Sequence, residues 1–141
     1  MASRDQKLEM LRRVPLFARL SPRQIQRIGA LADEVDVPDG KVLTREGASG
    51  QEFFVLVDGQ ARVERAGKLV GKLSPGDFFG EIALIDGGPR TATVQAEGAA
   101  RLLVLNRPQF LSLLREFQDI HIEILEALAH RVRQLLPEAL H

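Results

Sequence analysis

The sequence predicts a mainly β domain, a double-stranded β-helix (jelly-roll) barrel with helices before and after it. Two patterns support this fold class. Between residues 33 and 106, short segments alternate apolar and polar residues and are separated by turns that contain glycine. On both sides of that stretch, apolar residues recur with helical spacing instead.

The chain of 141 residues is long enough to form one domain around a core of its own. With 45% apolar and 27% charged residues, its composition is that of an ordinary globular protein. We therefore expect a single domain over residues 1–141, with N-terminal helices over 1–32, a barrel over 33–106 and C-terminal helices over 107–136.

Two helices are expected in the N-terminal part. The first covers about residues 5–13 and ends at Pro15, which lacks an amide hydrogen. The second begins after Ser21, whose hydroxyl can cap it. Pro22 fits the first helical position, and Gln24 can return a hydrogen bond to the cap.

The barrel is expected to consist of many short strands joined by tight turns. Asp58-Gly59 and Ala66-Gly67 occupy positions where hairpin turns need a positive φ. Gly98 is expected to separate two further strands near the end of the barrel.

Two phenylalanine pairs lie in the predicted strands, Phe53-Phe54 and Phe78-Phe79. Bulky aromatic residues in a β-rich domain are most often part of the core. Since successive side chains of a strand point to opposite faces, we expect one member of each pair to be partly exposed.

The C-terminal part is expected to form a helix capped by Asn106 and a last helix from about residue 119 to 136, before Pro137. The last helix carries an apolar stripe with spacings of three, four and three, made up of Leu125, Leu128, Val132 and Leu135. The stripe either packs on the barrel or forms a homodimer contact with a second copy.

The charge balance gives no support for binding to nucleic acid or to an anionic membrane, because 19 basic residues match 19 acidic ones. The first thirty residues are locally basic, which fits a solvated helix face or a contact with an acidic partner. The N-terminus lacks the apolar run of a signal peptide, and no segment resembles a membrane span. A cytoplasmic location is the default expectation.

Enzymatic function is not expected, and neither is a metal site or a cofactor. The chain has no cysteine, and its three histidines, His121, His130 and His141, all follow the predicted strands. No Ser-His-Asp or Cys-His arrangement can therefore form inside the barrel. The sequence also ends about five residues after the last helix, which leaves no room for a helix-turn-helix motif.

The stretch FFGEIALIDGGPRTATV, residues 78–94, combines groups that suit a small phosphorylated ligand. Gly80 allows close approach of the backbone, and Arg90 can hold an anion with its guanidinium fork. Glu81 would repel an anion, so its natural task is to accept a hydrogen bond from a sugar hydroxyl. A carboxylate that can bind a sugar hydroxyl and a guanidinium that can bind a phosphate together indicate a nucleotide ligand.

The blocks FGEIAL and PRTATV resemble the phosphate-binding cassette of the cyclic nucleotide-binding domain family, which includes kinase regulatory subunits, gated channels and bacterial catabolite activators. Further similar blocks, such as VPDGKVLTREG and EFFVLVDGQARV, extend the resemblance over about residues 14–135. The resemblance implies that Glu81 binds the ribose 2′-hydroxyl and that Arg90 pairs with the cyclic phosphate. The implied ligand-binding residues are Phe79, Gly80, Glu81, Ile82, Ala83, Arg90, Thr91 and Ala92.

The resemblance also implies that the last helix closes over the base as a lid. That helix offers no aromatic residue to stack on a purine. The candidates for the base contact are Ile124, Leu128 and Arg131, which could supply an apolar cover or a guanidinium plane.

Cyclic AMP is the expected ligand, and cyclic GMP is the alternative because Thr91 could also contact a guanine. Further alternatives are a regulatory fragment of a larger transcription factor, channel or enzyme, with its output unknown, and a degenerate domain that binds nothing. Since the expected partner of Arg90 is the ligand, replacing this arginine is expected to leave the fold intact.

Overall fold

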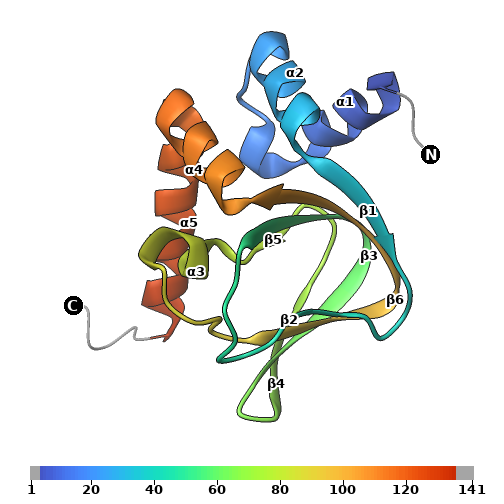
Figure 1. Ribbon diagram of the computed structural model, residues 1–141, viewed down its shortest axis with the longest axis vertical. Coiled ribbons are helices and arrows are strands. Elements are labelled where there is room, and N and C mark those ends of the chain that lie inside the picture. Colours follow the sequence, from blue (N-terminus) through green and yellow to red (C-terminus); the bar gives the residue numbers. More distant parts are fainter. Residues whose placement is uncertain (1–3, 136–141) are drawn as a thin grey trace.

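The computed structural model describes residues 4–135 and confirms a mainly β domain with flanking helices (Figure 1). The N-terminal helices are α1 (Arg4–Arg13), the 3₁₀ helix η1 (Pro15–Phe17) and α2 (Pro22–Leu31). The strands are β1 (Asp33–Val37), β2 (Val42–Thr44), β3 (Glu52–Arg65), β4 (Lys68–Leu73), β5 (Phe78–Phe79) and β6 (Thr93–Asn106). A short helix, α3 (Glu81–Asp86), precedes β6, and α4 (Arg107–Glu116) and α5 (Gln118–Leu135) follow it.

The two long strands β3 and β6 form the centre of one antiparallel sheet that curls around an interior (Figure 1). β1 and β2 both pair with β6, while β4 and β5 both pair with β3. In Figure 1 the helices α3, α4 and α5 lie on one side of this barrel, and α1 and α2 lie at its top. The segment between β5 and β6 is therefore next to the C-terminal helices.

One of the two predicted hairpin turns is confirmed and the other is wrong. Ala66 and Gly67 have φ values of 51° and 76° and reverse the chain between β3 and β4. Asp58 and Gly59 instead lie inside β3, where the register with β6 shifts. Gly59 has a φ of 90°, and a Cβ there would lie 2.6 Å from the carbonyl oxygen of Ala99. Its positive φ bends a strand that continues.

The prediction of two strands around Gly98 is wrong for the same reason. β6 runs without interruption from Thr93 to Asn106 and includes Gly98, which has a φ of 80°. The amide of Gly98 binds the side chain of Asp39 at 2.7 Å, so a neighbouring loop supports this bend. Local turn chemistry cannot distinguish a bend within a strand from a reversal of the chain.

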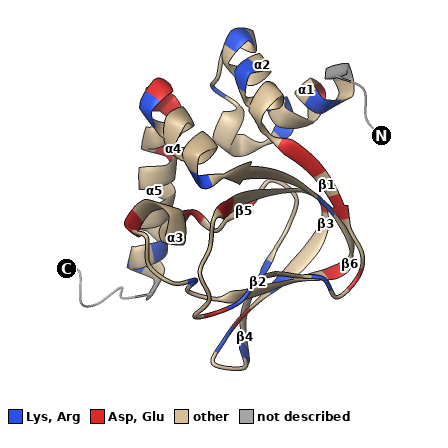
Figure 2. Ribbon diagram, in the orientation of Figure 1, with Lys and Arg blue, Asp and Glu red and all other residues tan. Residues whose placement is uncertain are grey.

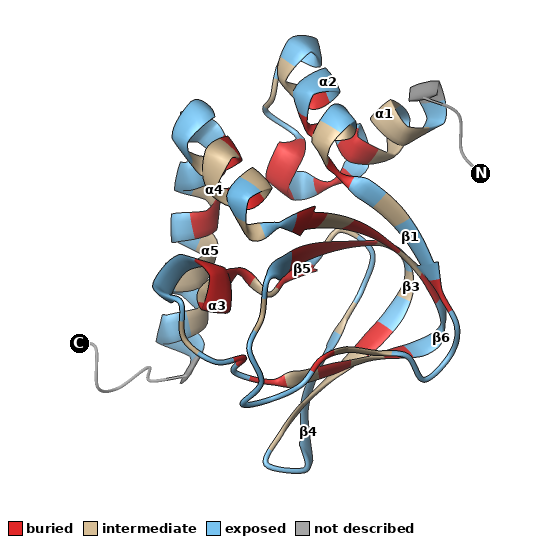
Figure 3. Cartoon of the chain, in the orientation of Figure 1, coloured by how far each residue is buried: buried red, intermediate tan, exposed pale blue. Residues whose placement is uncertain are grey.

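The expectation that one member of each phenylalanine pair is partly exposed is also wrong, since all four rings are buried (Figure 3). Phe53 and Phe78 belong to the apolar cluster between the barrel and the helices. Phe54 and Phe79 belong to a second cluster inside the barrel. The side chains do alternate, but helices cover the outer face of the sheet at this point, so both faces are buried.

The helix boundaries agree with the sequence. Capping boxes form at Ser21 and Asn106, with return bonds from Gln24 and Gln109. α5 matches the predicted last helix, except that residue 136 lies outside the described residues.

α5 packs on the rest of the domain through a face that lies beside the predicted stripe and includes one of its members, the partly buried Leu128. Ile120 and Ile124 are buried in the cluster between barrel and helices. By contrast, Leu125 is 53% exposed and Val132 is 46% exposed. The side chain of Leu135, the last member of the stripe, lies outside the part that can be described.

Basic residues lie on α1 and α2, and acidic residues lie on α4 (Figure 2). Two arginines of the N-terminal part pair with the C-terminal helices. Arg27 of α2 donates two hydrogen bonds to Glu116 at the end of α4, at 3.3 and 3.2 Å. Arg19 lies 3.1 Å from Glu123 of α5. Both contacts are partly solvent-exposed, so they align the two helical segments more than they stabilise the fold. Within residues 4–135, no helix is long and apolar enough to cross a membrane.

Candidate functional site

Gly80 sits at the N-terminal end of α3 in a left-handed conformation, with a φ of 91°. A Cβ at this position would lie 2.8 Å from Nη1 of Arg90 and 2.8 Å from the carbonyl oxygen of Glu52. Both the backbone angle and the lack of space therefore require glycine. The short helix α3 follows at once, with Ala83 and Leu84 buried.

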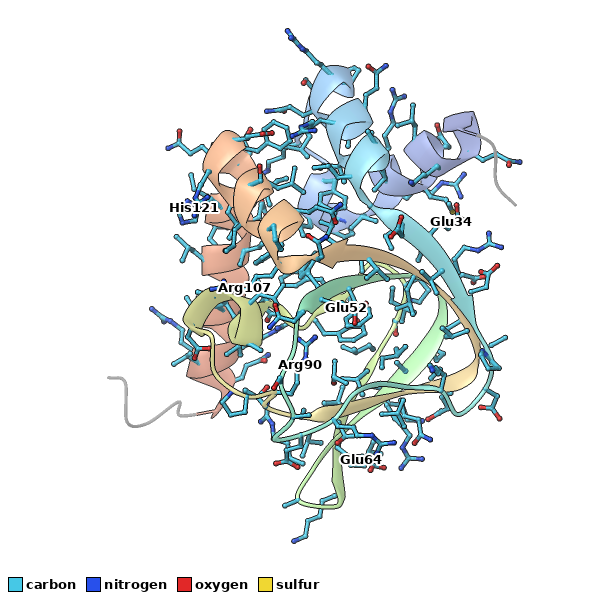
Figure 4. All side chains as sticks on the ribbon, in the orientation of Figure 1. Glu34, Glu52, Glu64, Arg90, Arg107 and His121 are labelled. Carbon is cyan, nitrogen blue, oxygen red and sulfur yellow. The ribbon has the colours of Figure 1, made fainter. Side chains whose placement is uncertain are left out.

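Arg90 is held by backbone atoms from two directions (Figure 4). Its Nη1 donates to the carbonyl of Gly80 at 2.9 Å, and its Nη2 donates to the carbonyl of Glu52 at 2.8 Å. Its main chain is bonded to the loop before β3, through Ala48 and Gly47 at 2.8 Å each. The side chain is thus fixed in place before any ligand arrives.

Arg90 is only 7% exposed. Burial lowers the pKa of its guanidinium, and the carboxylates of Glu52 and Glu81 oppose that shift. The side chain already bonds two carbonyls, so the ligand is not its only partner, and the expectation that its loss leaves the fold intact stays a prediction to be tested. Removal of the guanidinium leaves two partly buried acceptors without their donor.

Gly50 is a site residue that the sequence analysis missed. A Cβ at this position would lie 2.0 Å from Nε of Arg90, so any side chain here would displace the guanidinium. Gly50 lies 40 positions before Arg90 in the chain, and no local pattern connects the two.

Glu81 lies almost completely inside the protein, with 1% of its surface exposed. Nη1 of Arg131 on α5 donates to Oε1 of Glu81, and Nη2 of the same arginine donates to the carbonyl of Phe78 at 3.0 Å. The guanidinium also lies over the Phe78 ring, 4.9 Å from its centroid. Burial raises the pKa of Glu81, while the charges of Arg131 and Arg90 act against this rise.

A cavity of about 510 Å³ lies between α3, α5 and the β3–β4 hairpin. The cavity is lined by all eight residues predicted for ligand binding: Phe79, Gly80, Glu81, Ile82, Ala83, Arg90, Thr91 and Ala92. Of the three candidate lid residues, Leu128 and Arg131 line the cavity, whereas Ile124 lies in the core. Further lining residues that the sequence analysis did not identify include Val63, Arg65, Val70, Lys72 and Gln134.

The cavity has the size and chemistry of a small-molecule site. It combines a fixed guanidinium, a buried carboxylate and apolar walls from Val63, Val70 and Leu128. Such a cavity can hold a phosphate at one end and a flat apolar group at the other. In the described part of the chain, no group of histidine and acidic side chains could hold a metal ion.

Comparison with known proteins agrees with this chemistry. The family model of the cyclic nucleotide-binding domain matches residues 34–117, which include the strands and the whole cassette. The chain belongs to this family. Several of the similar proteins are named as regulatory subunits.

Curated relatives include a kinase subunit and a channel. A cAMP-dependent protein kinase regulatory subunit of Mycosarcoma maydis is 38% identical over 110 residues, which cover 72% of this chain and 21% of that protein. A cyclic nucleotide-gated potassium channel of Mesorhizobium japonicum is 37% identical over 112 residues, 79% of this chain and 31% of the channel. The chain therefore spans less than a third of the length of these two relatives.

Solved structures show the same fold. PfPKA-R bound to cAMP superimposes with a TM-score of 0.84 and 28% identity, over 96% of this chain and 47% of that one. The Thermus thermophilus catabolite activator protein has a TM-score of 0.80 and 29% identity, over 89% of this chain and 61% of that one.

Proposed function

We propose that this cyclic nucleotide-binding domain is a sensor for cyclic AMP. The observation that carries the proposal is that Arg90 and Glu81 line the same cavity, one as a fixed cation and the other as a buried acceptor. The N–H groups of Arg90 that do not bond carbonyls would donate to the cyclic phosphate. A carboxylate oxygen of Glu81 would accept a hydrogen bond from the ribose 2′-hydroxyl.

A more specific part of the proposal is that the site prefers adenine to guanine. Support comes from relatives named for cAMP and from structures that contain it. Within the cavity, Leu128, Val63 and Val70 supply apolar lining, which suits a purine face. Thr91 also lines the cavity, and its hydroxyl keeps cyclic GMP as the second candidate.

The signal is proposed to pass through α5. This helix contributes Leu128, Arg131 and Gln134 to the cavity wall, so a bound ligand would contact it directly. A ligand shifts a conformational equilibrium only by its differential affinity for the two states. We therefore expect ligand to tighten residues 118–135 against the cavity and to slow hydrogen exchange there. The effector that responds would lie in a larger assembly of the kinase, channel or activator type.

The test is calorimetric titration of the wild type with cyclic AMP, cyclic GMP and linear 5′-AMP. We expect tight binding of cyclic AMP, weaker binding of cyclic GMP and no heat with 5′-AMP. Replacing Arg90 by alanine should cost about 2–5 kcal/mol of binding, as expected when one side of a buried charge pair is removed.

Because Arg90 also bonds two carbonyls, the alanine variant must be checked for folding by circular dichroism. Arg90→Lys is the companion variant, since it keeps the charge but loses the two-pronged geometry. Arg101→Ala is the matched control, because Arg101 pairs with Asp36 on the outside of the barrel. A folded wild type that gives no heat with either cyclic nucleotide would refute the proposed function.

A further inference from the structure

A second cavity shares part of its wall with the first. It has a volume of about 540 Å³ and is lined by residues 40–45, residues 48–52 and Arg90. We call it the loop cavity, because β2 and the segment between β2 and β3 form most of its wall. Arg90 and Thr44 line both cavities, and each is only 7% exposed. The two cavities therefore meet at two buried polar side chains.

Hydrogen bonds hold the wall of the loop cavity in place. The amide of Gly47 donates to the carbonyl of Arg90, and the amide of Arg90 donates to the carbonyl of Ala48, at 2.8 Å each. The hydroxyl of Thr44 donates to the carbonyl of Ala92 at 2.9 Å. These bonds join the segment between β2 and β3 to the chain on both sides of Thr91. The loop cavity is thus built by the fold and is not a gap beside a loosely attached segment.

The charge of the lining is mainly positive. Lys41, Arg45 and Arg90 are cationic, and Glu52 is the one acidic residue among the lining residues. Glu52 lies next to Arg90, to which it offers its carbonyl (Figure 4).

Two of these cations have no partner of their own. Within the described residues, the side chains of Lys41 and Arg45 form no hydrogen bond or ion pair, and both residues are exposed. Neither residue lines the first cavity. A small anion with several oxygen atoms would give both side chains charge-assisted hydrogen bonds.

We propose that the loop cavity is a second ligand site, which binds a small anion of the phosphate monoester class through Lys41 and Arg45. Because Arg90 lines both cavities, this anion and a cyclic phosphate in the first cavity would repel each other across one guanidinium. Each ligand should therefore weaken the binding of the other by the same factor. The site itself does not depend on the proposed function, whereas this coupling rests on it.

The site is tested by following backbone amide shifts in NMR spectra during titration with inorganic phosphate and with glycerol 3-phosphate. Chloride keeps the ionic strength constant, so that screening does not change. We expect saturable shifts at residues 40–52, both without cyclic AMP and with cyclic AMP at saturation. The cyclic nucleotide fills the first cavity, so shifts that remain in its presence report on the loop cavity.

Three variants show which side chains hold the anion. The double variant Lys41→Gln/Arg45→Gln should bind both probes about tenfold more weakly or worse, because it loses two hydrogen bonds to a charged group. Glu52→Gln should bind them about twofold to threefold more tightly, because it removes an exposed like charge. Lys68→Gln is the matched control, since Lys68 is an exposed lysine of β4 that lines neither cavity.

Calorimetry tests the coupling. Saturating phosphate should weaken cyclic AMP binding by about fivefold and no further, which is the lower end of usual coupling between two sites. Direct competition for the first cavity would instead weaken binding without a limit as phosphate rises. In the double variant this effect of phosphate should disappear.

The outcomes separate the second site from the proposed function. The site is refuted if neither probe shifts residues 40–52, if bound cyclic AMP abolishes the shifts, or if the double variant shifts like the wild type. Saturable shifts with no change in cyclic AMP affinity would refute the coupling alone. A wild type that binds no cyclic nucleotide would refute the proposed function, and the titration of the double variant would still decide on the loop cavity.

Discussion

The two charged side chains of the site are held by different parts of the molecule. Arg90 is oriented by carbonyls of Gly80 and Glu52, which belong to the barrel and its cassette. Glu81 is oriented by Arg131, which belongs to a helix outside the barrel. In the proposed binding mode, the phosphate would therefore be held by the barrel half of the site, whereas the sugar would be held by a helical half that is complete only when α5 is in place.

Under the proposed function, this difference would allow the binding site to act as a switch as well. The barrel half can capture an anion regardless of where the helices lie. We propose that the helical half responds to the ligand by a change in the position of α5, a helix that packs on the domain through Ile120, Ile124 and the partly buried Leu128. Three further predictions test whether the two halves are separable.

The largest effect on stability is expected for the aromatic residues of β3, which face the helices on one side of the sheet and the barrel interior on the other. Phe53 of β3 stacks on Phe110 of α4 with a centroid distance of 4.6 Å, whereas Phe54 stacks on Phe79 inside the barrel at 4.8 Å. Replacing either ring by alanine should cost about 3–5 kcal/mol of stability. Hydrogen exchange should rise mainly in α4 and α5 for Phe53→Ala, and mainly in the strands for Phe54→Ala.

Where the alanine variants do not fold, the leucine variants Phe53→Leu and Phe54→Leu give the same comparison at a smaller cost. The measurement is amide exchange by mass spectrometry, with stability from urea titration. Identical exchange patterns in the two variants would mean that barrel and helices open as one unit, and the division into two halves would then be incorrect.

The next prediction concerns ligand affinity and tests only the barrel half of the site, which contains Arg90. In Gly50→Ala, the added methyl group would overlap with Nε of Arg90, so the guanidinium must move. We expect cyclic AMP binding to weaken by about 2 kcal/mol, roughly thirtyfold, because the two-pronged contact with phosphate is lost. Calorimetry measures this effect.

The matched control for this variant is Gly29→Ala on α2. A methyl group there would meet only the flexible side chains of Leu8 and Leu11, at 3.1 and 3.4 Å. Binding should be unchanged in this control. Unchanged binding in Gly50→Ala would show that Arg90 recognises phosphate from more than one position, and the barrel half would then be less rigid than its hydrogen bonds indicate.

The same division separates what could be predicted from the sequence and what could not. Gly80, Glu81 and Arg90 lie within one short segment, so their chemistry and their spacing were visible together. Gly50 and Arg131 reach the site from distant parts of the chain. Gly50 was not predicted, and Arg131 was predicted as a contact for the base and not as the partner of Glu81. Only the path of the backbone in space brings them to the cassette.

Errors in the strand predictions have a similar origin. Asp58-Gly59 and Gly98 have the chemistry of turns, yet both lie within long strands because the sheet has to bend there to curl into a barrel. The burial of both rings in each phenylalanine pair depends on helices that cover the outer face of the sheet. Local patterns predicted the type of each element, and tertiary contacts decided its length and its exposure.

The smallest effect on stability is expected on the outer face of α5. Val132 and Leu125 are exposed there, and we propose that this face forms the homodimer contact. Val132→Glu should change the stability of the dilute protein by less than about 0.5 kcal/mol, as is usual for a surface position. In sedimentation velocity, the wild type should dimerise with increasing concentration, and the variant should stay monomeric.

Leu69→Glu is the matched control, because Leu69 is a similarly exposed apolar residue that lies on β4 and not on α5. If both variants dimerise like the wild type, α5 is not the contact. If the wild type itself stays monomeric at high concentration, the exposed face of α5 is free to meet another protein. The helical half of the site would then report the presence of ligand to that partner, and a second copy of this chain would not be needed.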